Sequence, residues 1–110
     1  MIRFEYLLED YFSSGKAEKI GLPTVQYYAD KLHLSANYLS DMMRKETGST
    51  ALRYIHDKAI DIAKTQIVTT NKTISEIAYQ LGFQYSQHFT RLFKKNVGYT
   101  PNKYRNLNLM

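Results

Sequence analysis

The apolar positions of this chain form one pattern that occurs twice, about fifty residues apart. The first copy runs from Val25 to Tyr54 and the second from Ile74 to Tyr104. Matching positions lie 49 residues apart before the turn, as with Ala29 and Ala78, and 50 apart after it. Each copy has a short segment of helical periodicity, a break and a longer periodic segment, which predicts a helix-turn-helix. The chain therefore holds one small unit twice, with one extra residue in the second turn.

Spacing and capping residues predict the helices of the first half. Residues 2–13 carry apolar side chains three and four positions apart and should form an amphipathic helix, followed by a polar connection from Gly15 to Gly21. Thr24 and Ser35 are suited to cap the two helices of the first unit, and the second of these should end near Thr47.

The second half is predicted in the same way. Thr73 should cap a helix from Ile74 to Leu81, and a longer helix should run from Ser86 to about Val97. Pro101 suits the first turn of a last helix that continues through Arg105. The tail, residues 106–110, is expected to fray because little holds it.

Between the units, helical spacing continues from Thr50 to about Thr70 without glycine or proline. A helix of this length is a rod of about 30 Å, close to the roughly 34 Å of one B-DNA turn. We expect it to be shared by both units, since each unit alone is too small to bury a sufficient core. The fold class is thus all-α with about seven helices in one domain, residues 1–110. Its parts are a first helix-turn-helix at about 22–48, a linking helix at about 50–70 and a second helix-turn-helix at about 73–105.

The distribution of charge along the chain indicates a class of partner. Residues 1–50 hold six Lys/Arg and seven Asp/Glu, whereas residues 51–110 hold nine and three. A basic second half favours a polyanion as partner, with a solvated basic surface as the alternative. The chain has no cysteine, which excludes disulfides and thiolate metal sites. No apolar run approaches the roughly 18 residues of a membrane span, so we expect a cytoplasmic protein without a membrane contact. If the polyanion partner is DNA, the protein is also expected to be nucleoid-associated.

Several stretches of the second copy resemble the signature of AraC/XylS-type transcriptional regulators. They are the runs Ile74–Phe83, Phe89–Lys95, Gly98–Pro101 and Tyr104–Arg105. In the first copy, Leu34–Ser35, Tyr38–Ser40 and Lys45–Gly48 are similar to the family's first helix-turn-helix. The resemblance implies the all-helical C-terminal DNA-binding domain of a bacterial transcription factor. Two departures stand out: Ala59 replaces a common arginine of the linking helix, and Asp41 occupies a position that is often basic.

The resemblance also implies partners. Such regulators bind promoter or operator DNA as a double strand and then recruit or block RNA polymerase. They usually carry a sensor or dimerisation domain before the DNA-binding part, so we expect this chain to be a C-terminal fragment that lacks it. The expected function is sequence-specific binding with recognition helices 35–47 and 86–97 in adjacent major grooves.

In a helix-turn-helix, the second helix presents its outward residues to base edges. With the apolar positions turned inward, the predicted base-reading residues are Asn37, Ser40, Asp41, Ser86, Gln87, Thr90 and Arg91. Asn and Gln suit adenine, Asp suits the cytosine amino group, and Arg suits guanine. For each residue the alternative is a helix-start role, a solvated side chain or, for Arg91, a phosphate contact.

Phosphate contacts are predicted from basic side chains and from helix starts with free N–H groups. The residues are Thr24, Arg44, Lys45, Thr73, Lys94 and Lys95. Lys45 and Lys95 are otherwise plain surface charges. Tyr54 and Tyr104 occupy equivalent places, where we expect each to pack its reading helix against the element that follows.

Two other classes of function are weighed against DNA binding. An enzyme is not expected: His56, Asp57 and Asp61 read as solvated charges, and no nucleophile, metal-ligand spacing or cofactor motif is present. A helical protein–protein interaction module with only nonspecific DNA affinity is the alternative function. Its adhesive face would be the aromatic first helix, with Tyr6, Tyr11 and Phe12.

Overall fold

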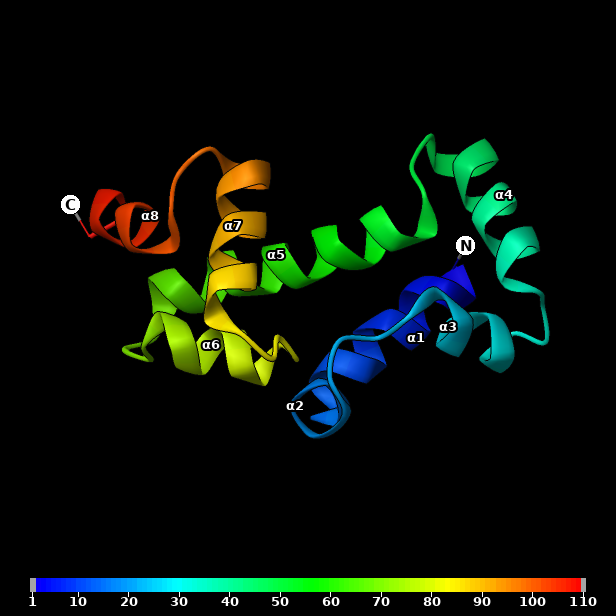
Figure 1. The fold of residues 1–110 in the computed structure, drawn as a ribbon, viewed down its shortest axis with the longest axis horizontal. Coiled ribbons are helices and arrows are strands. Elements are labelled where there is room, and N and C mark those ends of the chain that lie inside the picture. The colour runs from blue at the N-terminus through cyan, green and yellow to red at the C-terminus, as the bar shows by residue number, and fades with distance from the viewer. Residues whose placement is uncertain (1, 110) are drawn as a thin grey trace.

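The computed structural model describes residues 2–109, which fold into an elongated all-helical body of 44 × 28 × 23 Å (Figure 1). This confirms the predicted fold class. Within the described residues there are eight helices and no strand. In chain order the helices are α1 (Ile2–Ser13), α2 (Lys16–Ile20), α3 (Val25–Lys31), α4 (Ala36–Thr47), α5 (Ala51–Thr69), α6 (Ile74–Gln80), α7 (Ser86–Val97) and α8 (Pro101–Leu107).

The predicted polar connection between Gly15 and Gly21 is wrong in one respect, because it contains the short helix α2, which brings the expected count of about seven helices to eight. Gly15 turns the chain with a φ of 84°, and the five residues that follow bury Ala17 completely. A single helical turn is too short for apolar periodicity to reveal.

The C-terminal prediction also needs correction, since α8 continues two residues beyond Arg105. Asn106 and Leu107 are helical rather than frayed, and Asn108 closes the helix by donating its side-chain amide to the Tyr104 carbonyl at 2.7 Å. Residue 110 lies outside the described residues.

The predicted caps are confirmed. Thr24, Ser35 and Thr73 each accept a hydrogen bond from the backbone N–H three residues later, at 3.0 Å in every case. Thr50 and Thr100 do the same for α5 and α8. These hydroxyls satisfy one of the four unpaired N–H groups at each helix start, which fixes where each helix begins.

Helix α5 supplies side chains to two separate hydrophobic cores. Its first half places Ala51 and Ile55 in a core with α1, α3 and α4, and its second half, from Ala59 to Ile67, belongs to a core with α6 and α7. The expectation of one shared linking helix is therefore confirmed. Ala59, which stands where the family pattern has an arginine, is fully buried and acts as a packing residue.

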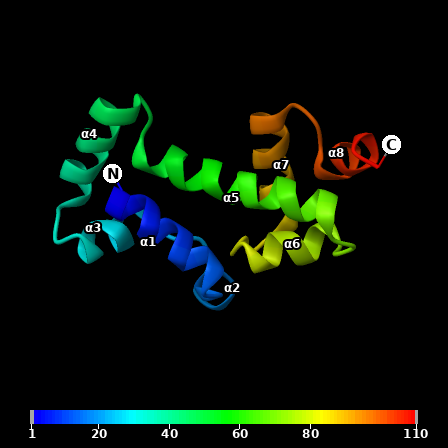
Figure 2. The same ribbon diagram turned by 180° about the vertical axis from the view of Figure 1, so that it is seen from behind.

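Helix α1 lies beside the first half of α5 in the views from both sides (Figures 1 and 2). The Tyr54 hydroxyl donates to Glu5 at 2.5 Å, which raises the pKa of Tyr54 to about 12, and Lys58 pairs with Glu9. Tyr11 is buried in the first core, where its hydroxyl donates to the Gly21 carbonyl.

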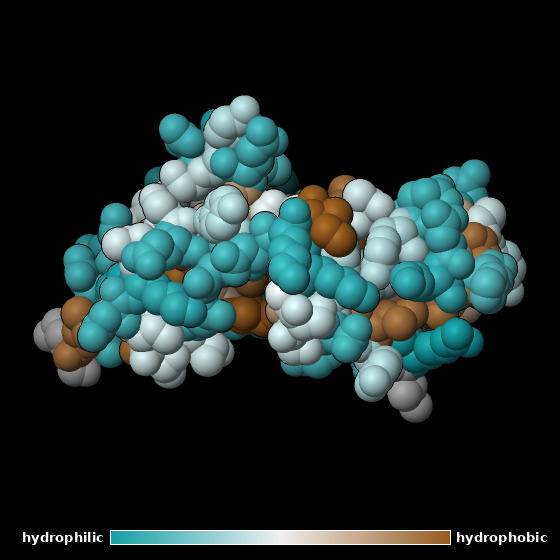
Figure 3. Space-filling view, turned by 90° about the horizontal axis from the view of Figure 1, so that it is seen from below, coloured by the Kyte–Doolittle hydropathy of each residue, from teal (hydrophilic) through white to brown (hydrophobic). Residues whose placement is uncertain are grey.

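The aromatic first helix consequently does not offer the adhesive face of the alternative function. Tyr11 is buried and Phe12 is half-buried against both cores, which leaves Tyr6 exposed. Seen from below, the surface is mostly hydrophilic, and its hydrophobic patches are interrupted rather than continuous (Figure 3). No described helix combines the length and the apolar character needed to cross a membrane.

Candidate nucleic-acid interface

Helices α4 and α7 stand at different places along α5. Helix α4 lies beyond the N-terminal end of α5, α7 crosses its C-terminal half, and both run in the same direction in Figure 1. Each is anchored by one fully buried pair four residues apart, Leu39 with Met43 in α4 and Phe89 with Phe93 in α7. Because buried residues recur on one side of each helix, the opposite side of both helices faces solvent.

Four of the predicted base-reading residues are exposed on these outer sides. Asn37 and Asp41 lie four residues apart on α4, and Gln87 and Arg91 lie four residues apart on α7, so each pair shares a helix face. The three short hydroxyl residues are half-buried at the edges of these faces; they are Ser40, Ser86 and Thr90. The fold thus brings the predicted residues into two matching patches.

Exposed cations occupy the last turns of both helices: Arg44 and Lys45 on α4, Lys94 and Lys95 on α7. The ion pairs found among residues 2–109 are Arg53 with Asp57 and Lys58 with Glu9. In that part of the chain, the four cations and Arg91 therefore have no carboxylate partner. Unpaired cations near a helix C-terminus complement the helix dipole and remain available to an external anion.

The two predicted phosphate contacts at helix starts differ from one another. At α3, Thr24 caps the Tyr27 N–H and no acidic residue lies in the first turn. At α6, Thr73 and Glu76 form a reciprocal capping box that uses the N–H groups of both residues. The bond from the Thr73 N–H lowers the pKa of Glu76, so a carboxylate sits at this helix start. The Glu76 charge repels a phosphate at the start of α6, so the start of α3 at Thr24 is better suited to a phosphate contact than the start of α6 at Thr73.

Two exposed residues on the same faces were missed by sequence reasoning. Tyr38 lies three residues before Asp41, and His88 lies three residues before Arg91. They occupy equivalent positions in the two copies. The signal that would have found them is helix geometry, because a residue three positions before Asp41 or Arg91 lies on the same helix face as that residue.

The end of the sequence signature has a structural role. Arg105 donates from Nε to the Ile67 carbonyl at 2.9 Å and from its terminal nitrogen to the Thr70 carbonyl at 3.4 Å. It thereby caps the C-terminus of α5, whose last carbonyls have no partner inside the helix. The Tyr104 ring packs on Phe93 of α7 with centroids 5.5 Å apart, as predicted for this residue.

In the first unit, the equivalent residue has a different partner. The Tyr54 ring packs on Phe4 of α1, with centroids 5.7 Å apart. Within residues 2–109 no cluster of three or more His, Cys, Asp or Glu side chains is arranged to hold a metal ion.

Comparison with known proteins places this geometry among helix-turn-helix domains. A family model described as a helix-turn-helix domain matches residues 28–107. The bifunctional transcriptional activator/DNA repair enzyme AdaA of Bacillus subtilis is 32% identical over 104 residues, which cover 94% of this chain and 48% of AdaA. The transcriptional activator RhaS of an Enterobacter strain is 33% identical over 98 residues, covering 89% of this chain and 33% of RhaS.

A solved structure agrees over nearly its full length. The C-terminal domain of the two-component response regulator yesN from Fusobacterium nucleatum superposes with a TM-score of 0.77 at 32% identity, covering 92% of this chain and 96% of that domain. The chain spans half or less of the length of the curated relatives that it matches.

Proposed function

This chain belongs to the AraC-type family of helix-turn-helix domains, and from that premise we infer that it is the double-stranded-DNA-binding part of a bacterial transcription regulator. One observation carries the proposal. Two equivalent helices packed on one shared helix, α4 and α7, each present an exposed polar face that ends in two cations, and none of these cations pairs with a carboxylate of residues 2–109. A protein that binds DNA needs such cations to replace the counterions of the phosphates.

The length of the shared helix is compatible with recognition helices in two successive major grooves. Helix α5 has 19 residues, which at 1.5 Å per residue is about 28 Å, somewhat less than the roughly 34 Å of one DNA turn. We propose that α4 and α7 enter adjacent major grooves on one face of the duplex. The two helix-turn-helix units, each with its recognition helix, are called the two reading heads below. Because the two heads differ in sequence, the DNA site is asymmetric and one chain suffices to bind it.

Specific contacts follow from the chemistry of the exposed residues. Asn37 and Gln87 offer the paired donor and acceptor that adenine requires, and Arg91 can donate to both acceptors of guanine. Asp41 can accept from the cytosine amino group, so the first head would read a base that the second does not. Ser40, Ser86 and Thr90 are short and half-buried, and they reach only a base edge that comes close to the helix.

Phosphate contacts would hold both heads in register. Arg44 and Lys45 on α4 and Lys94 and Lys95 on α7 are exposed for this purpose. The backbone at Thr24 adds a contact at the start of α3, and we rank Thr73 below it because of the Glu76 carboxylate. These contacts position the protein and carry no sequence information.

The activity of the whole protein is a separate proposal, since the chain corresponds to part of its relatives. We propose that a sensor or dimerisation domain completes the regulator and that DNA binding recruits or blocks RNA polymerase at a promoter. Such a protein acts on the nucleoid and performs no catalysis with this domain.

The proposal is tested by selecting bound duplexes from a random pool of about 25 base pairs, a little more than two helical turns. The selection is repeated at two salt concentrations. We expect an asymmetric motif with two patches about one helical turn apart, and affinity that falls steeply with salt. A single patch would limit reading to one head. Salt-sensitive binding without enrichment would favour the interaction module with nonspecific DNA affinity, and no binding would refute the proposal.

A further inference from the structure

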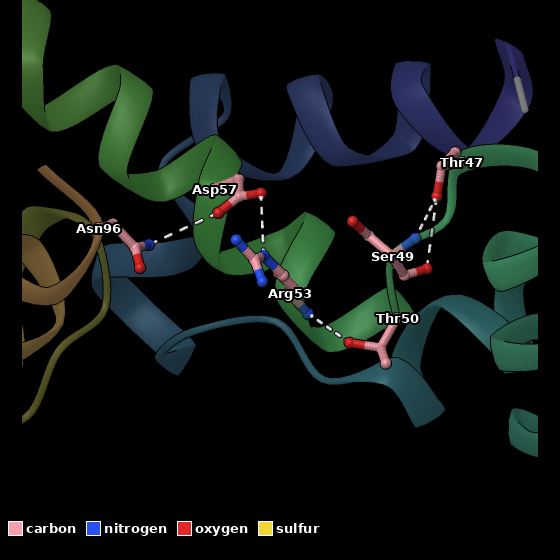
Figure 4. A network of polar contacts seen from close by, with 6 residues as sticks. All are labelled: Thr47, Ser49, Thr50, Arg53, Asp57 and Asn96. Atoms are coloured by element: carbon pink, nitrogen blue, oxygen red, sulfur yellow. Dashed lines mark hydrogen bonds and ion pairs between the residues drawn. The ribbon is translucent and has the colours of Figure 1, made fainter.

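A hollow of about 390 Å³ lies between the first half of α5 and the C-terminal half of α7. None of the contacts proposed above for base reading accounts for it. The polar residues that line it are Thr50 at the cap of α5, Arg53, His56 and Asp57 from α5, and Lys95 and Asn96 from α7. Figure 4 shows the polar part of this junction, with Asp57 between Arg53 and Asn96.

The hollow lies against α7 and against the start of α5, the helix that follows α4. On one side it is bounded by Lys95, which is four residues beyond Arg91 and therefore on the same face of α7. On the other side it is bounded by Thr50, the cap of α5, three residues after α4 ends at Thr47. A duplex that received α4 and α7 in successive major grooves would present the intervening minor-groove backbone to this place.

The charges of the hollow favour an anion. Arg53 and Lys95 are its fixed cations, and Asp57 is the one carboxylate that lines it. Asp57 is engaged already, since it contacts the Arg53 Nε at 4.0 Å and accepts from the Asn96 side chain at 3.5 Å. The contact through Nε leaves both terminal amino groups of Arg53 available, on a side chain that is 72% exposed. A guanidinium presented in this way matches two phosphate oxygens.

His56 adds a neutral donor rather than a third cation. It is half-buried at the wall of the hollow, and burial lowers its pKa below the ordinary 6.5. The nearby His88 of α7 lowers the pKa further, whereas Asp57 raises it. At neutral pH the imidazole is uncharged and can still donate one N–H.

We propose that this hollow binds a DNA backbone phosphate between the two reading heads, with Arg53 and Lys95 as its cationic ligands. The inference rests on the proposed function and deepens it, because it assigns a third point of attachment to the linking helix. Such an anchor fixes the distance between the heads along the duplex. It contributes affinity without base preference.

The duplication supplies a matched control. Arg53 is the third residue of α5 and Lys103 is the third residue of α8; both N–H groups donate to a capping threonine, and both side chains are exposed. Lys103 lies on the helix that follows α7, away from the hollow. Arg53→Ala and Lys103→Ala therefore remove the same charge at equivalent positions, and only the first alters the hollow.

The test is the salt dependence of binding to a random duplex of about 25 base pairs and to the selected duplex, for the wild type and the variants. Each phosphate contact makes affinity fall about 3.5-fold more between roughly 50 and 200 mM salt. We expect Arg53→Ala and Lys95→Ala each to lose that factor and Lys103→Ala to keep it. Equal slopes for Arg53→Ala and wild type, or equal losses for Arg53→Ala and Lys103→Ala, would overturn the proposal.

Neutral methylphosphonate linkages then locate the contact. They replace single phosphates between the two patches of the selected duplex. At one linkage the wild type should lose affinity, and Arg53→Ala and Lys95→Ala should each lose less than the wild type, because each variant already lacks one of the two cationic ligands of that phosphate. Losses that add at every linkage would overturn the bridging contact. Circular dichroism confirms that each variant is folded, and a wild type that binds neither duplex would instead refute the proposed function.

Discussion

The two helix-turn-helix units make the same turn with different residues. In the first unit the Leu34 N–H donates to the Ala29 carbonyl at 2.8 Å. In the second unit the Phe83 N–H donates to the equivalent carbonyl, that of Ala78, at 3.0 Å. The residue in the left-handed conformation is His33 in the first unit, with a φ of 58°, and Gly82 in the second, with a φ of 97°. The same left-handed backbone conformation therefore carries a side chain in the first unit and none in the second.

Packing between the units explains the difference. His33 is exposed, so its side chain extends into solvent. Gly82 touches the connection between α2 and α3, where its carbonyl accepts from the Leu22 N–H at 3.2 Å. A Cβ on Gly82 would lie 2.5 Å from backbone atoms of Gly21 and Leu22. The second turn is thus also the junction of the two units, and this long-range contact selects its residue.

The largest expected effect tests that contrast directly. Gly82→Ala should destabilise the protein by about 4 kcal/mol or more, because the new methyl group collides with backbone and the φ is unfavourable for alanine. His33→Gly, at the equivalent site, should be neutral or stabilise by up to about 1 kcal/mol. Urea unfolding of both variants measures the difference. Similar losses for both would mean that the turn conformation, rather than the junction, sets the requirement.

This contrast also marks how far sequence reasoning could go. Periodicity located α4 and α7 to within one residue, and the Ser35 cap set the start of α4, because these signals act between neighbours three or four positions apart. The Gly82 junction and the Arg105 cap on α5 join residues far apart in the chain, and no local pattern encodes them. The predicted reading faces rest on local helix geometry, whereas the hollow between α5 and α7 required the fold.

The second comparison is between the two reading heads, where Asp41 occupies the place of Arg91. If the proposed function holds, Arg91→Ala should cost about 1 to 3 kcal/mol of binding free energy and relax the preference at one base pair. Asp41→Ala should cost less and change the preference at a different base pair. Titration of the selected duplex and of single-base variants measures both.

The two measurements can contradict the proposed roles of Arg91 and Asp41 independently. An equal loss of affinity for selected and random DNA on Arg91→Ala would show that Arg91 holds a phosphate. Tighter binding of all duplexes by Asp41→Ala would show that Asp41 only repels the backbone. Lys94→Ala serves as the control, since loss of a phosphate contact should weaken all sequences alike.

A smaller effect separates the two cores. Tyr28 is fully buried in the first core, and its hydroxyl has no hydrogen-bond partner in the part of the chain that the structure describes; the equivalent residue of the second core is Ile77. Tyr28→Phe should stabilise the protein by about 1 kcal/mol, because an unpaired buried hydroxyl is removed and the ring is kept. Tyr54→Phe, which deletes the bond to Glu5, should destabilise by about the same amount. Thermal unfolding distinguishes the two signs, and a loss on Tyr28→Phe would contradict the unpaired state of that hydroxyl.

The smallest expected effect concerns the starts of α3 and α6. Glu76 completes the capping box of α6, and the hydrogen bond from the backbone N–H of Thr73 lowers the pKa of Glu76 below the ordinary 4.5. In α3 the equivalent place is held by Tyr27, which has no carboxyl group. A lowered folded-state pKa means that Glu76 stabilises the fold above its unfolded-state pKa, and that this contribution disappears as pH falls through the folded-state value. Wild type and Glu76→Gln should therefore differ in melting temperature at about pH 6 and converge toward about pH 3. A constant difference across this range would show that the side chain acts through packing at α6 and not through its charge, which would remove the electrostatic distinction between the two helix starts.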